Sequence, residues 1–367
     1  MNNSTPKVSV LMSVYNGTLY LKESIESILK QTFTDFEFII LDDCSTDNTW
    51  EVLTKYTKLD QRILLIRNEK NFGLTRSLNK GLKVAKGEYI ARQDADDISL
   101  TERFKKQVVY LNNHSEIVLT SCDIELINAE GASIGSFRRA CDPDLLAWYL
   151  LFYNRLAGHS QVIFRRKPVI DLGGYSENYR YGQDYELWCR LLKVGKIFIL
   201  PDILLQQRLH SDRISVEKKS AQEVCALTQV KHNIEQLIEK EISLSEAQDL
   251  MGFWIGHWWS HCFPESKQVD ILHDRLTEIL REFLRQNPRY ISSQHEMAHQ
   301  LHHLIGEQFL SWIRALGIRH ELFSKLQVSF YALNWNSPSI VAACWLSDVR
   351  KSLARRLTRL KYSATAK

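Results

Sequence analysis

The sequence lacks three features that would assign a protein to a broad class at once. No stretch reaches the roughly 18 consecutive apolar residues of a membrane-spanning helix, so we expect none. Seven cysteines are scattered without a close pair, which predicts reduced thiols rather than a disulfide or zinc framework. The net charge is only +4 from 47 basic and 43 acidic residues, so the overall field does not favour a nucleic-acid partner.

The amino-terminal residues also lack the pattern of a secretion signal. No charged start, long apolar core and small-residue cleavage site precede the first expected strand. Together with the reduced cysteines, this predicts a cytoplasmic protein. The apolar fraction of 44% is enough to fill a core, so we expect a globular chain of one large or two ordinary domains.

From Val8 to about Ser215 the sequence alternates β-branched apolar runs with amphipathic helical segments. Strands are expected over residues 8–16, 36–43 and 63–68 and again from residue 88, with helices over 19–32, 46–58 and 74–86 between them. Repeated strand, helix, strand units predict parallel strands joined by right-handed crossovers. The expected fold class is therefore α/β, with a ligand crevice at the carboxyl ends of the strands.

Beyond about Val216 the pattern changes to apolar residues spaced three and four apart, which predicts helices almost throughout. The clearest expected helices cover residues 223–240, 245–259, 267–286 and 297–316. We therefore predict an α/β catalytic domain over residues 1–216 and a mostly helical domain over residues 217–367.

Three carboxylates crowd into RQDADD, Arg92 to Asp97, at the end of the fourth expected strand. Carboxylates this close repel one another unless a cation lies among them. Mg²⁺ and Mn²⁺ take such oxygen ligands together with substrate phosphates, so a metal bound to a diphosphate fits the cluster. The alternative is that Asp96 and Asp97 only cap a helix that begins near Ser99.

A second acidic pair, Asp42 and Asp43, follows the second expected strand in ILDDCSTDNTW. One interpretation is a ligand site, in which an aspartate accepts the imide proton of a pyrimidine base. The other is that Asp43 to Thr46 are only turn and cap residues. Tyr15 and Asn16 end the first strand, so these side chains are expected at the same edge of the sheet.

Six blocks of the sequence together resemble the family 2 glycosyltransferases of the GT-A fold. They are VSVLMSVYNG, LDDCSTDNT, NFGLTRSLNKGL, KGEYIARQDADD, GGYSENYRYGQDYELWCRL and QRLHSDRIS, and they cover about residues 6–216 in the family's order. The resemblance implies a Rossmann-like, mainly parallel sheet and transfer of a sugar, with inversion, from a nucleotide-sugar, expected to be a UDP-sugar. The Gln-x-x-Arg-Trp block of processive members is absent, so one sugar is expected per encounter.

The resemblance also implies which residues bind the donor. Arg76 and Arg92 would approach the nucleotide, because a planar guanidinium can donate two bonds to a diphosphate; a solvated position is the alternative for either arginine. The residues implied to line the nucleoside are Ser13, Tyr15, Asn16, Asp42 and Asp43.

A metal ion, Mn²⁺ or Mg²⁺, is implied at the acidic cluster. Asp96 is the expected direct ligand, while Asp94 and Asp97 would bond the ribose, the donor sugar or the metal and its waters. Arg208 and His210 match the family's Arg-x-His block. The resemblance implies that Arg208 binds the nucleotide-sugar and that His210 reaches the metal or the diphosphate. The alternative for His210 is a surface loop residue.

The same resemblance assigns the catalytic base to Asp184 in QDYELWCRL. An inverting transfer needs one carboxylate to take the proton from the attacking hydroxyl, opposite the departing diphosphate. The preceding residue is commonly Glu in the family and is Gln183 here, so the pKa of the base should be raised less than in a paired-acid site. Glu186 is the fallback base, although an ion pair with Arg190 is its more ordinary role. His159 is a further candidate for shaping the acceptor pocket.

The carboxyl-terminal segment combines positive charge with an apolar stripe. From Val349 onward it has seven basic residues and no acid. Apolar residues recur at spacings of three and four, namely Leu346, Val349, Leu353, Leu357 and Leu360. This pattern predicts an interfacial helix attracted to anionic lipid, and hence peripheral contact with the inner face of the plasma membrane. The alternative is a solvated or partner-packed terminal helix.

HEMAH, His295 to His299, matches the HExxH signature of zinc hydrolases. A third ligand is required, and the places where one class of these enzymes has Gly and His hold His302 and Ile305 instead. The favoured hypothesis is therefore a sugar transferase acting on a glycan or lipid-linked oligosaccharide in surface polysaccharide synthesis. The alternatives are a zinc hydrolase built on His295, Glu296 and His299, and a sugar-nucleotide-binding module without turnover.

Overall fold

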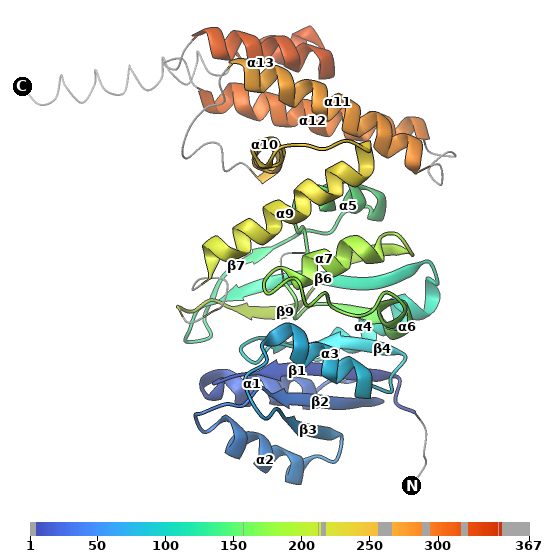
Figure 1. The fold of residues 1–367 in the computed structure, drawn as a ribbon, viewed down its shortest axis with the longest axis vertical. Helices are drawn as coiled ribbons and strands as arrows, with labels where there is room; N and C mark the ends of the chain where they lie inside the picture. Colours follow the sequence, from blue (N-terminus) through green and yellow to red (C-terminus); the bar gives the residue numbers. More distant parts are fainter. Residues whose placement is uncertain are drawn as a thin grey trace, which may run out of the picture. The chain divides into compact units, whose positions relative to one another are not determined.

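The computed structural model describes residues 5–156, 158–211, 213, 218–255, 266–287, 294–316, 322–343 and 345–346 (Figure 1). The chain divides into two compact units, Met1–Gln229 and Val230–Lys367. The division falls within helix α9 (Lys219–Ile238), later in the chain than the change of sequence pattern near residue 216.

The first half of the α/β unit is a set of parallel strands with helical crossovers, as the sequence pattern predicts. Hydrogen bonds pair β2 with β1 and β3, and β1 with β4, all in parallel. Figure 1 shows α2 beside β3 at the outer edge of this sheet. The elements are β1 (Val8–Val14), α1 (Thr18–Leu29), β2 (Phe36–Asp42), α2 (Thr49–Leu59), β3 (Ile63–Arg67), α3 (Leu74–Val84) and β4 (Tyr89–Arg92).

The second half continues the same sheet with mixed pairing. Strand β8 joins β4 antiparallel, β6 pairs antiparallel with β8 and parallel with β9, and the full order is β3-β2-β1-β4-β8-β6-β9-β5. The sheet is therefore mixed, whereas the resemblance implied a mainly parallel one. The elements are β5 (Ile98–Ser99), α4 (Arg103–Asn113), β6 (Ile117–Ile127), β7 (Ser133–Phe137), α5 (Pro143–Leu150), β8 (Ile163–Arg165), α6 (Arg166–Asp171), α7 (Gln183–Leu191) and β9 (Lys196–Arg208).

The core of this unit holds the central strands whose ends carry the site. The central strands β1, β2 and β4 are apolar on both faces, so helices must cover both sides. Ile25 and Ile28 of α1 and Phe104 and Val108 of α4 pack fully buried against these strands. The β1–β4 register sets Leu11 opposite Arg92, so the chain following β4 emerges next to the end of β1.

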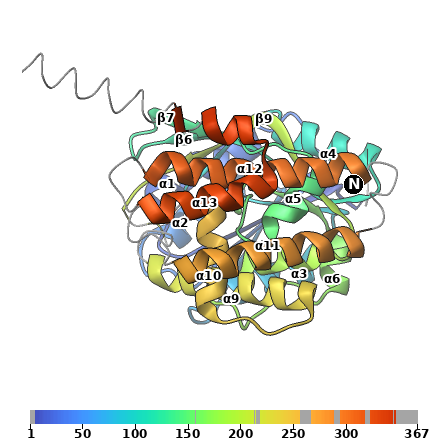
Figure 2. The same ribbon diagram turned by 90° about the horizontal axis from the view of Figure 1, so that it is seen from above.

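The second unit is helical in all its described elements, in agreement with the pattern of spacings. Ser243 and Glu246 form a reciprocal capping box at the start of α10, each accepting the other's backbone N–H at 3.1 Å. Figure 2 shows α12 and α13 lying alongside each other, and Phe253, Phe309 and Trp312 form an aromatic core. After α9 come α10 (Leu244–Ile255), α11 (Ser266–Gln286), α12 (Gln294–Leu316) and α13 (Leu322–Trp335).

The cysteines that the structure describes, Cys44, Cys122, Cys141, Cys189 and Cys225, are free thiols. None of the helices in the described ranges combines the length and the apolar character needed to cross a bilayer.

Candidate active site

Asp43, at the carboxyl end of β2, holds the loop that precedes α3. Its side chain is 2% exposed and accepts hydrogen bonds from Asn68 Nδ2 at 2.7 Å and from the backbone N–H groups of Phe72 and Gly73 at 3.0 and 2.8 Å. Gly73 has a φ of 86°, a left-handed conformation that glycine adopts without strain. Asp43 therefore positions the loop before α3; its contact with a base stays a prediction.

Asp42 is fully buried and holds the loop that precedes α2. Its Oδ1 accepts the Ser45 N–H at 3.1 Å, and its Oδ2 lies 3.1 Å from Arg67 Nε. Arg67 in turn lies over the Trp50 ring, 4.8 Å from its centroid. The ends of β2 and β3 are thereby fixed to each other.

The end of β1 carries an exposed aromatic ring beside a clamped asparagine. Asn16 has a φ of 51°, donates its N–H to Ser45 Oγ at 3.0 Å and accepts the Thr46 N–H at 2.9 Å. Tyr15 is 49% exposed, while Ser13 is half-buried within β1. Since Asn16 is engaged within the protein, Tyr15 is the side chain at this strand end best placed to meet a ligand.

Arg76 lies on the first turn of α3 and is exposed, with Nε 3.0 Å from Glu177 Oε2. The same helix holds the loop that leads to α7, because Asn79 accepts the Tyr175 N–H at 2.9 Å and donates to the Tyr175 carbonyl at 2.8 Å. Arg76 is therefore free to rotate toward a nucleotide at the cost of one exposed ion pair, which contributes little to stability.

Arg92 lies beneath the strand ends and is completely buried. It donates to the Leu11 carbonyl, to Gln93 O at 2.9 Å, to Asp94 Oδ1 at 2.6 Å and to His159 Nε2 at 3.2 Å. With its nitrogens committed to protein groups, Arg92 is placed to position Asp94 rather than to touch a diphosphate. That differs from the implied approach of this arginine to the nucleotide.

His159 is a buried imidazole, and its role in shaping an acceptor pocket stays a prediction. Its Nε2 faces both Arg92 Nε and the Tyr175 hydroxyl, the latter at 2.7 Å. Because arginine can only donate, Nε2 accepts and the ring proton belongs on Nδ1. Burial lowers the pKa of His159 well below its ordinary value, and the charge of Arg92 acts in the same direction.

The acidic loop after β4 is held from several directions at once. The Asp94 N–H donates to Ser160 Oγ at 2.8 Å, and the Asp94 carbonyl accepts from Ser24 Oγ at 2.7 Å. Burial opposes the charge of Asp94, but the charge of Arg92 and the hydrogen bonds with Ser160 and Arg92, together with the other neighbouring groups, outweigh burial and lower the pKa below its ordinary value. Asp97 is 1% exposed, and burial, followed by the charges of Asp96 and Asp94, raises its pKa to about 8.

The helix-cap interpretation of this loop is wrong. Residues Ile98–Ser99 form strand β5, and the next helix, α4, begins only at Arg103. Asp97 Oδ1 instead accepts the backbone N–H of Arg208 at 3.1 Å, which ties the loop to the end of β9.

The end of β9 crosses the acidic loop and carries both residues of the Arg-x-His block. Arg208 is 1% exposed, donates to Glu23 Oε2 at 2.5 Å and lies over the Tyr20 ring, 4.4 Å from its centroid. His210 follows with Nε2 3.0 Å from Asp96 Oδ2. Arg208 is thus an anchor between β9 and α1, and His210 faces the acidic cluster rather than lying apart as a surface loop residue.

The donor set at this point fits a hard divalent cation. His210 Nδ1 is buried without a hydrogen-bond partner in the described part of the chain, and Asp96 is 27% exposed beside it. Such cations commonly bind through one or two carboxylates and complete their shell with water and substrate phosphates. The described residues contain no ready group of three His, Cys, Asp or Glu ligands, so Asp96 and His210 would need such further ligands.

Asp184 is the second residue of α7, a helix that begins after Gly182 in the left-handed conformation with a φ of 68°. Asn154 Nδ2 donates to Asp184 Oδ2 at 3.1 Å. Burial raises the pKa of Asp184 above its ordinary value and the charge of Asp94 adds to this, while the Tyr185 N–H and Asn154 act in the opposite direction. The structure thus brings Asp184 within electrostatic reach of the acidic loop.

The remainder of α7 has the packing that the sequence predicts. Glu186 forms a bidentate ion pair with Arg190, with distances of 2.5 and 2.6 Å, so its ordinary role is the observed one. Leu187, Trp188 and Leu191 are completely buried. The helix is therefore a rigid support that presents Asp184 at its amino end.

Three residues of this arrangement carry no sequence signal. Asn154 contacts Asp184, Tyr175 contacts His159, and Glu23 contacts Arg208. Each partner pair is far apart in the chain, so no local spacing could have indicated them.

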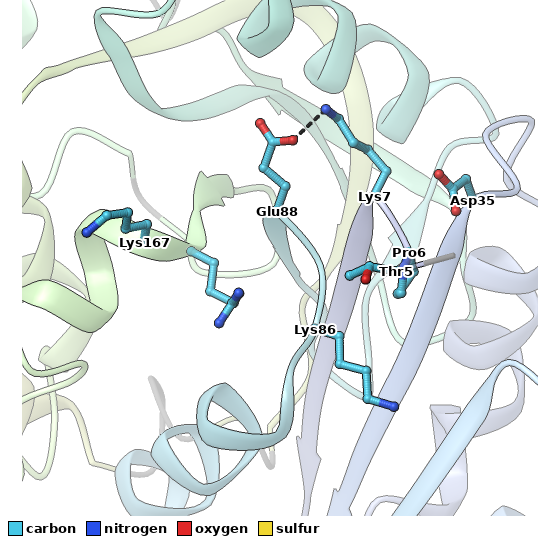
Figure 3. A pocket seen from close by; sticks show the side chains of 8 residues that line it. Thr5, Pro6, Lys7, Asp35, Lys86, Glu88 and Lys167 are labelled. Carbon is cyan, nitrogen blue, oxygen red and sulfur yellow. Dashed lines mark hydrogen bonds and ion pairs between the residues drawn. The ribbon is translucent and has the colours of Figure 1, made fainter. Parts of the chain in front are cut away.

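A separate cavity of about 380 Å³ lies at the amino ends of β1 and β4, the edge of the sheet opposite the candidate site. Figure 3 shows the Lys7–Glu88 ion pair on its wall. The lining side chains, among them Lys86 and Lys167, include none of the predicted site residues.

The HEMAH stretch occupies the first turn of α12, where Glu296 and His299 are exposed. The side chain of His295 and the basic segment from Val349 onward lie outside the described residues.

Comparison with known proteins agrees with the geometry. The family model described as Glycosyl transferase family 2 matches residues 9–158. An uncharacterized glycosyltransferase of Haemophilus influenzae is 33% identical over 247 residues, which cover 64% of this chain and 75% of the relative. The amylovoran biosynthesis glycosyltransferase AmsE of Erwinia amylovora is 32% identical over 222 residues, 56% of this chain and 78% of AmsE.

Among solved structures, S. aureus TarS 1-349 in complex with UDP-GlcNAc aligns with a TM-score of 0.54 over 89% of each chain. At 16% identity this likeness concerns the fold alone, which is that of a GT-A glycosyltransferase. The sequence relatives are closer and are covered over most of their length. The chain therefore belongs to glycosyltransferase family 2.

Proposed function

We propose that the protein transfers one sugar per encounter from a UDP-sugar, with inversion, to a glycan or lipid-linked acceptor in surface polysaccharide synthesis. The observation that carries the proposal is Asp184, a partly buried carboxylate at the amino end of α7 within electrostatic reach of Asp94. It supplies a base across from a cluster suited to a metal and a diphosphate. AmsE, a relative named for amylovoran synthesis, supports the acceptor class.

The donor binds at the carboxyl ends of β1, β2 and β4 in this proposal. Tyr15, exposed at the end of β1, covers the base, and Arg76 leaves its ion pair with Glu177 to reach the diphosphate. UDP is the nucleotide proposed because the structurally similar TarS binds UDP and UDP-GlcNAc. Arg92 holds Asp94 from below, so that its carboxylate stays ionised toward the donor.

Mn²⁺ or Mg²⁺ would be held by Asp96 and His210, with Asp94 as a further oxygen ligand. When bound, the cation neutralises the departing nucleoside diphosphate and makes it a better leaving group. Burial of Asp97 and its contact with the Arg208 N–H keep the acidic loop closed against β9.

Asp184 takes the proton of the acceptor hydroxyl as its oxygen bonds to the anomeric carbon and the bond from that carbon to the diphosphate oxygen breaks. Asn154 holds the Oδ2 atom of Asp184 and so orients the carboxylate. The raised pKa of Asp184 makes it a stronger base than an ordinary aspartate once it is ionised.

An acceptor carried on lipid requires the enzyme to work at a membrane surface. The basic segment from Val349 onward supplies the positive charge for contact with anionic lipid, and we propose a cytoplasmic protein with peripheral contact at the inner face of the plasma membrane.

Release of UDP from a panel of UDP-sugars, with and without Mn²⁺ or Mg²⁺, tests the proposal. The wild-type chain should release UDP with at least one donor. Asp184→Asn should bind that donor with unchanged affinity in a thermal-shift titration. Its rate of UDP release should be lower by about a hundredfold or more.

Each alternative gives a different result in the same assay. A binding module raises the melting temperature with a donor but releases no UDP in the wild type. A zinc hydrolase loses activity in His295→Ala and keeps it in Asp184→Asn. Full activity in Asp184→Asn contradicts the proposed mechanism whatever the donor.

A further inference from the structure

Helix α13 turns a row of large apolar side chains outward. Leu326, Phe330 and Leu333 are 53%, 63% and 44% exposed, and their spacing of four and three residues sets them on one face. The opposite face, with Val328 and Ala332 completely buried, packs within the helical unit against α12 and α11. The helix is therefore apolar on both its inner and its outer side.

The outer face also carries no charge. Between Leu322 and Leu346 the sole charged residue is Lys325, which is 1% exposed and lies with Nζ 4.6 Å from the centre of the Trp345 ring. A helix that faces water normally presents charged residues on its outer side. Two apolar residues that follow the helix in the chain, Ile340 and Leu346, are also exposed, at 45% and 60%.

Positive charge follows this surface directly in the chain. After Leu346 and Asp348 come seven basic residues and no acid. A second copy of the chain is a poor partner for the surface, because self-pairing would bring two basic segments together. An anionic phospholipid bilayer fits both the apolar residues and the basic residues that follow them. Its acyl boundary accepts apolar side chains, and its headgroups attract lysine and arginine.

We propose that the α13 face, defined as Leu326, Phe330 and Leu333, inserts into the interface of an anionic bilayer. The inference deepens the peripheral membrane contact proposed above, and rests on it, by naming the apolar element that enters the lipid. The basic segment supplies the salt-sensitive part of the affinity, and the α13 face supplies the part that salt does not screen.

Co-sedimentation of the full chain with vesicles tests this assignment. Two vesicle types are used, phosphatidylcholine mixed with phosphatidylglycerol, and phosphatidylcholine alone, at low and high salt. The triple variant Leu326→Ser, Phe330→Ser, Leu333→Ser should bind the mixed vesicles about a hundredfold more weakly at either salt concentration. Replacing Arg355, Arg356 and Arg359 by Gln should weaken binding at low salt only.

A matched control removes equally exposed apolar residues elsewhere. Leu59, Val224 and Leu244 are 77%, 64% and 53% exposed on α2, α9 and α10, and their triple Ser variant should bind vesicles as the wild type does. Unchanged melting temperatures confirm folding, and UDP release measured without vesicles should be equal in all variants, because none of these residues belongs to the candidate site.

Three results overturn the inference. The first is vesicle binding by the α13 triple variant that equals that of the wild type, and the second is no vesicle binding by the wild type. The third is self-association of the wild type that the α13 triple variant abolishes while vesicle binding persists, which assigns the face to a second copy. Absence of UDP release in the wild type would contradict the proposed function and leave the vesicle result to stand by itself.

Discussion

The acidic loop at residues 94–97 and the HEMAH stretch at residues 295–299 are both short clusters of metal-binding residue types, and the molecule treats them differently. The acidic loop receives contacts from α1, from Ser160 and from the end of β9. HEMAH lies on the first turn of one helix, with Glu296 and His299 exposed. A cluster of metal-binding residue types is therefore more than a sequence pattern where distant segments of the chain contact it. Four experiments test this contrast between the two clusters.

Replacement of Asp184 by Asn should have the largest effect. The proposed base then cannot take the acceptor proton, so kcat should fall by about a hundred- to ten-thousand-fold while donor binding is unchanged. Steady-state UDP release and donor titration measure the two quantities. Glu186→Gln is a poor control because it breaks the ion pair with Arg190. Glu177→Gln is poor as well, because Glu177 pairs with Arg76. The exposed Glu116→Gln, just before β6, is the better control. A fall in donor affinity that accounted for the whole loss would contradict the role of Asp184.

Removal of the metal should come next. Chelation should abolish activity and added Mn²⁺ or Mg²⁺ should restore it, whereas Asp96→Asn should lower kcat/KM by roughly a hundredfold and raise the metal concentration needed for half activity. Asp35→Asn, in the cavity at the opposite edge of the sheet, is the matched control and should behave as the wild type. Equal metal dependence in Asp96→Asn and the wild type would remove Asp96 from the ligand set.

The pH profile tests how Asn154 supports the base. Burial raises the pKa of Asp184, so kcat/KM should fall with decreasing pH at a higher pH than for an ordinary aspartate. The Asn154 hydrogen bond favours the ionised carboxylate, so Asn154→Ala should move this acid limb to still higher pH and cost about tenfold in kcat/KM on the limb. The exposed Asn113→Ala is the control. An unmoved limb would leave Asn154 with a packing role only.

Much of the first half of the fold could be predicted because its signals are local. The strands from Val8 to Arg92 and the helices between them follow from apolar runs and from three- and four-residue spacings, and the observed bounds differ by a few residues. The antiparallel insertion of β8 between β4 and β6 was not predicted, since a three-residue strand has no periodicity of its own. That insertion accounts for two of the antiparallel pairings, while β6–β7 and β5–β9 supply the others.

The candidate site also has features that the sequence predicts and features that it does not. The aspartates after β2 and β4 and their common edge could be predicted, because the carboxyl ends of parallel strands meet. The burial of Arg92 could not, since it depends on His159 and on the Leu11 carbonyl, both far from it in the chain. Asn154 could not be predicted either, because its contact with Asp184 exists only in the folded chain.

The smallest effect is expected at HEMAH. Glu296 and His299 are exposed on the first turn of α12, so Glu296→Gln and His299→Ala remove no buried contact and should leave UDP release and the denaturation midpoint unchanged. Zinc content by atomic absorption should also be the same in the wild type and in both variants. If the wild type holds one zinc ion per chain and His299→Ala loses it, HEMAH has a third ligand. Both clusters would then be metal sites, and they would differ in function. Equal zinc content in all three proteins supports the contrast, because only the acidic loop then has the contacts from distant segments that make a site.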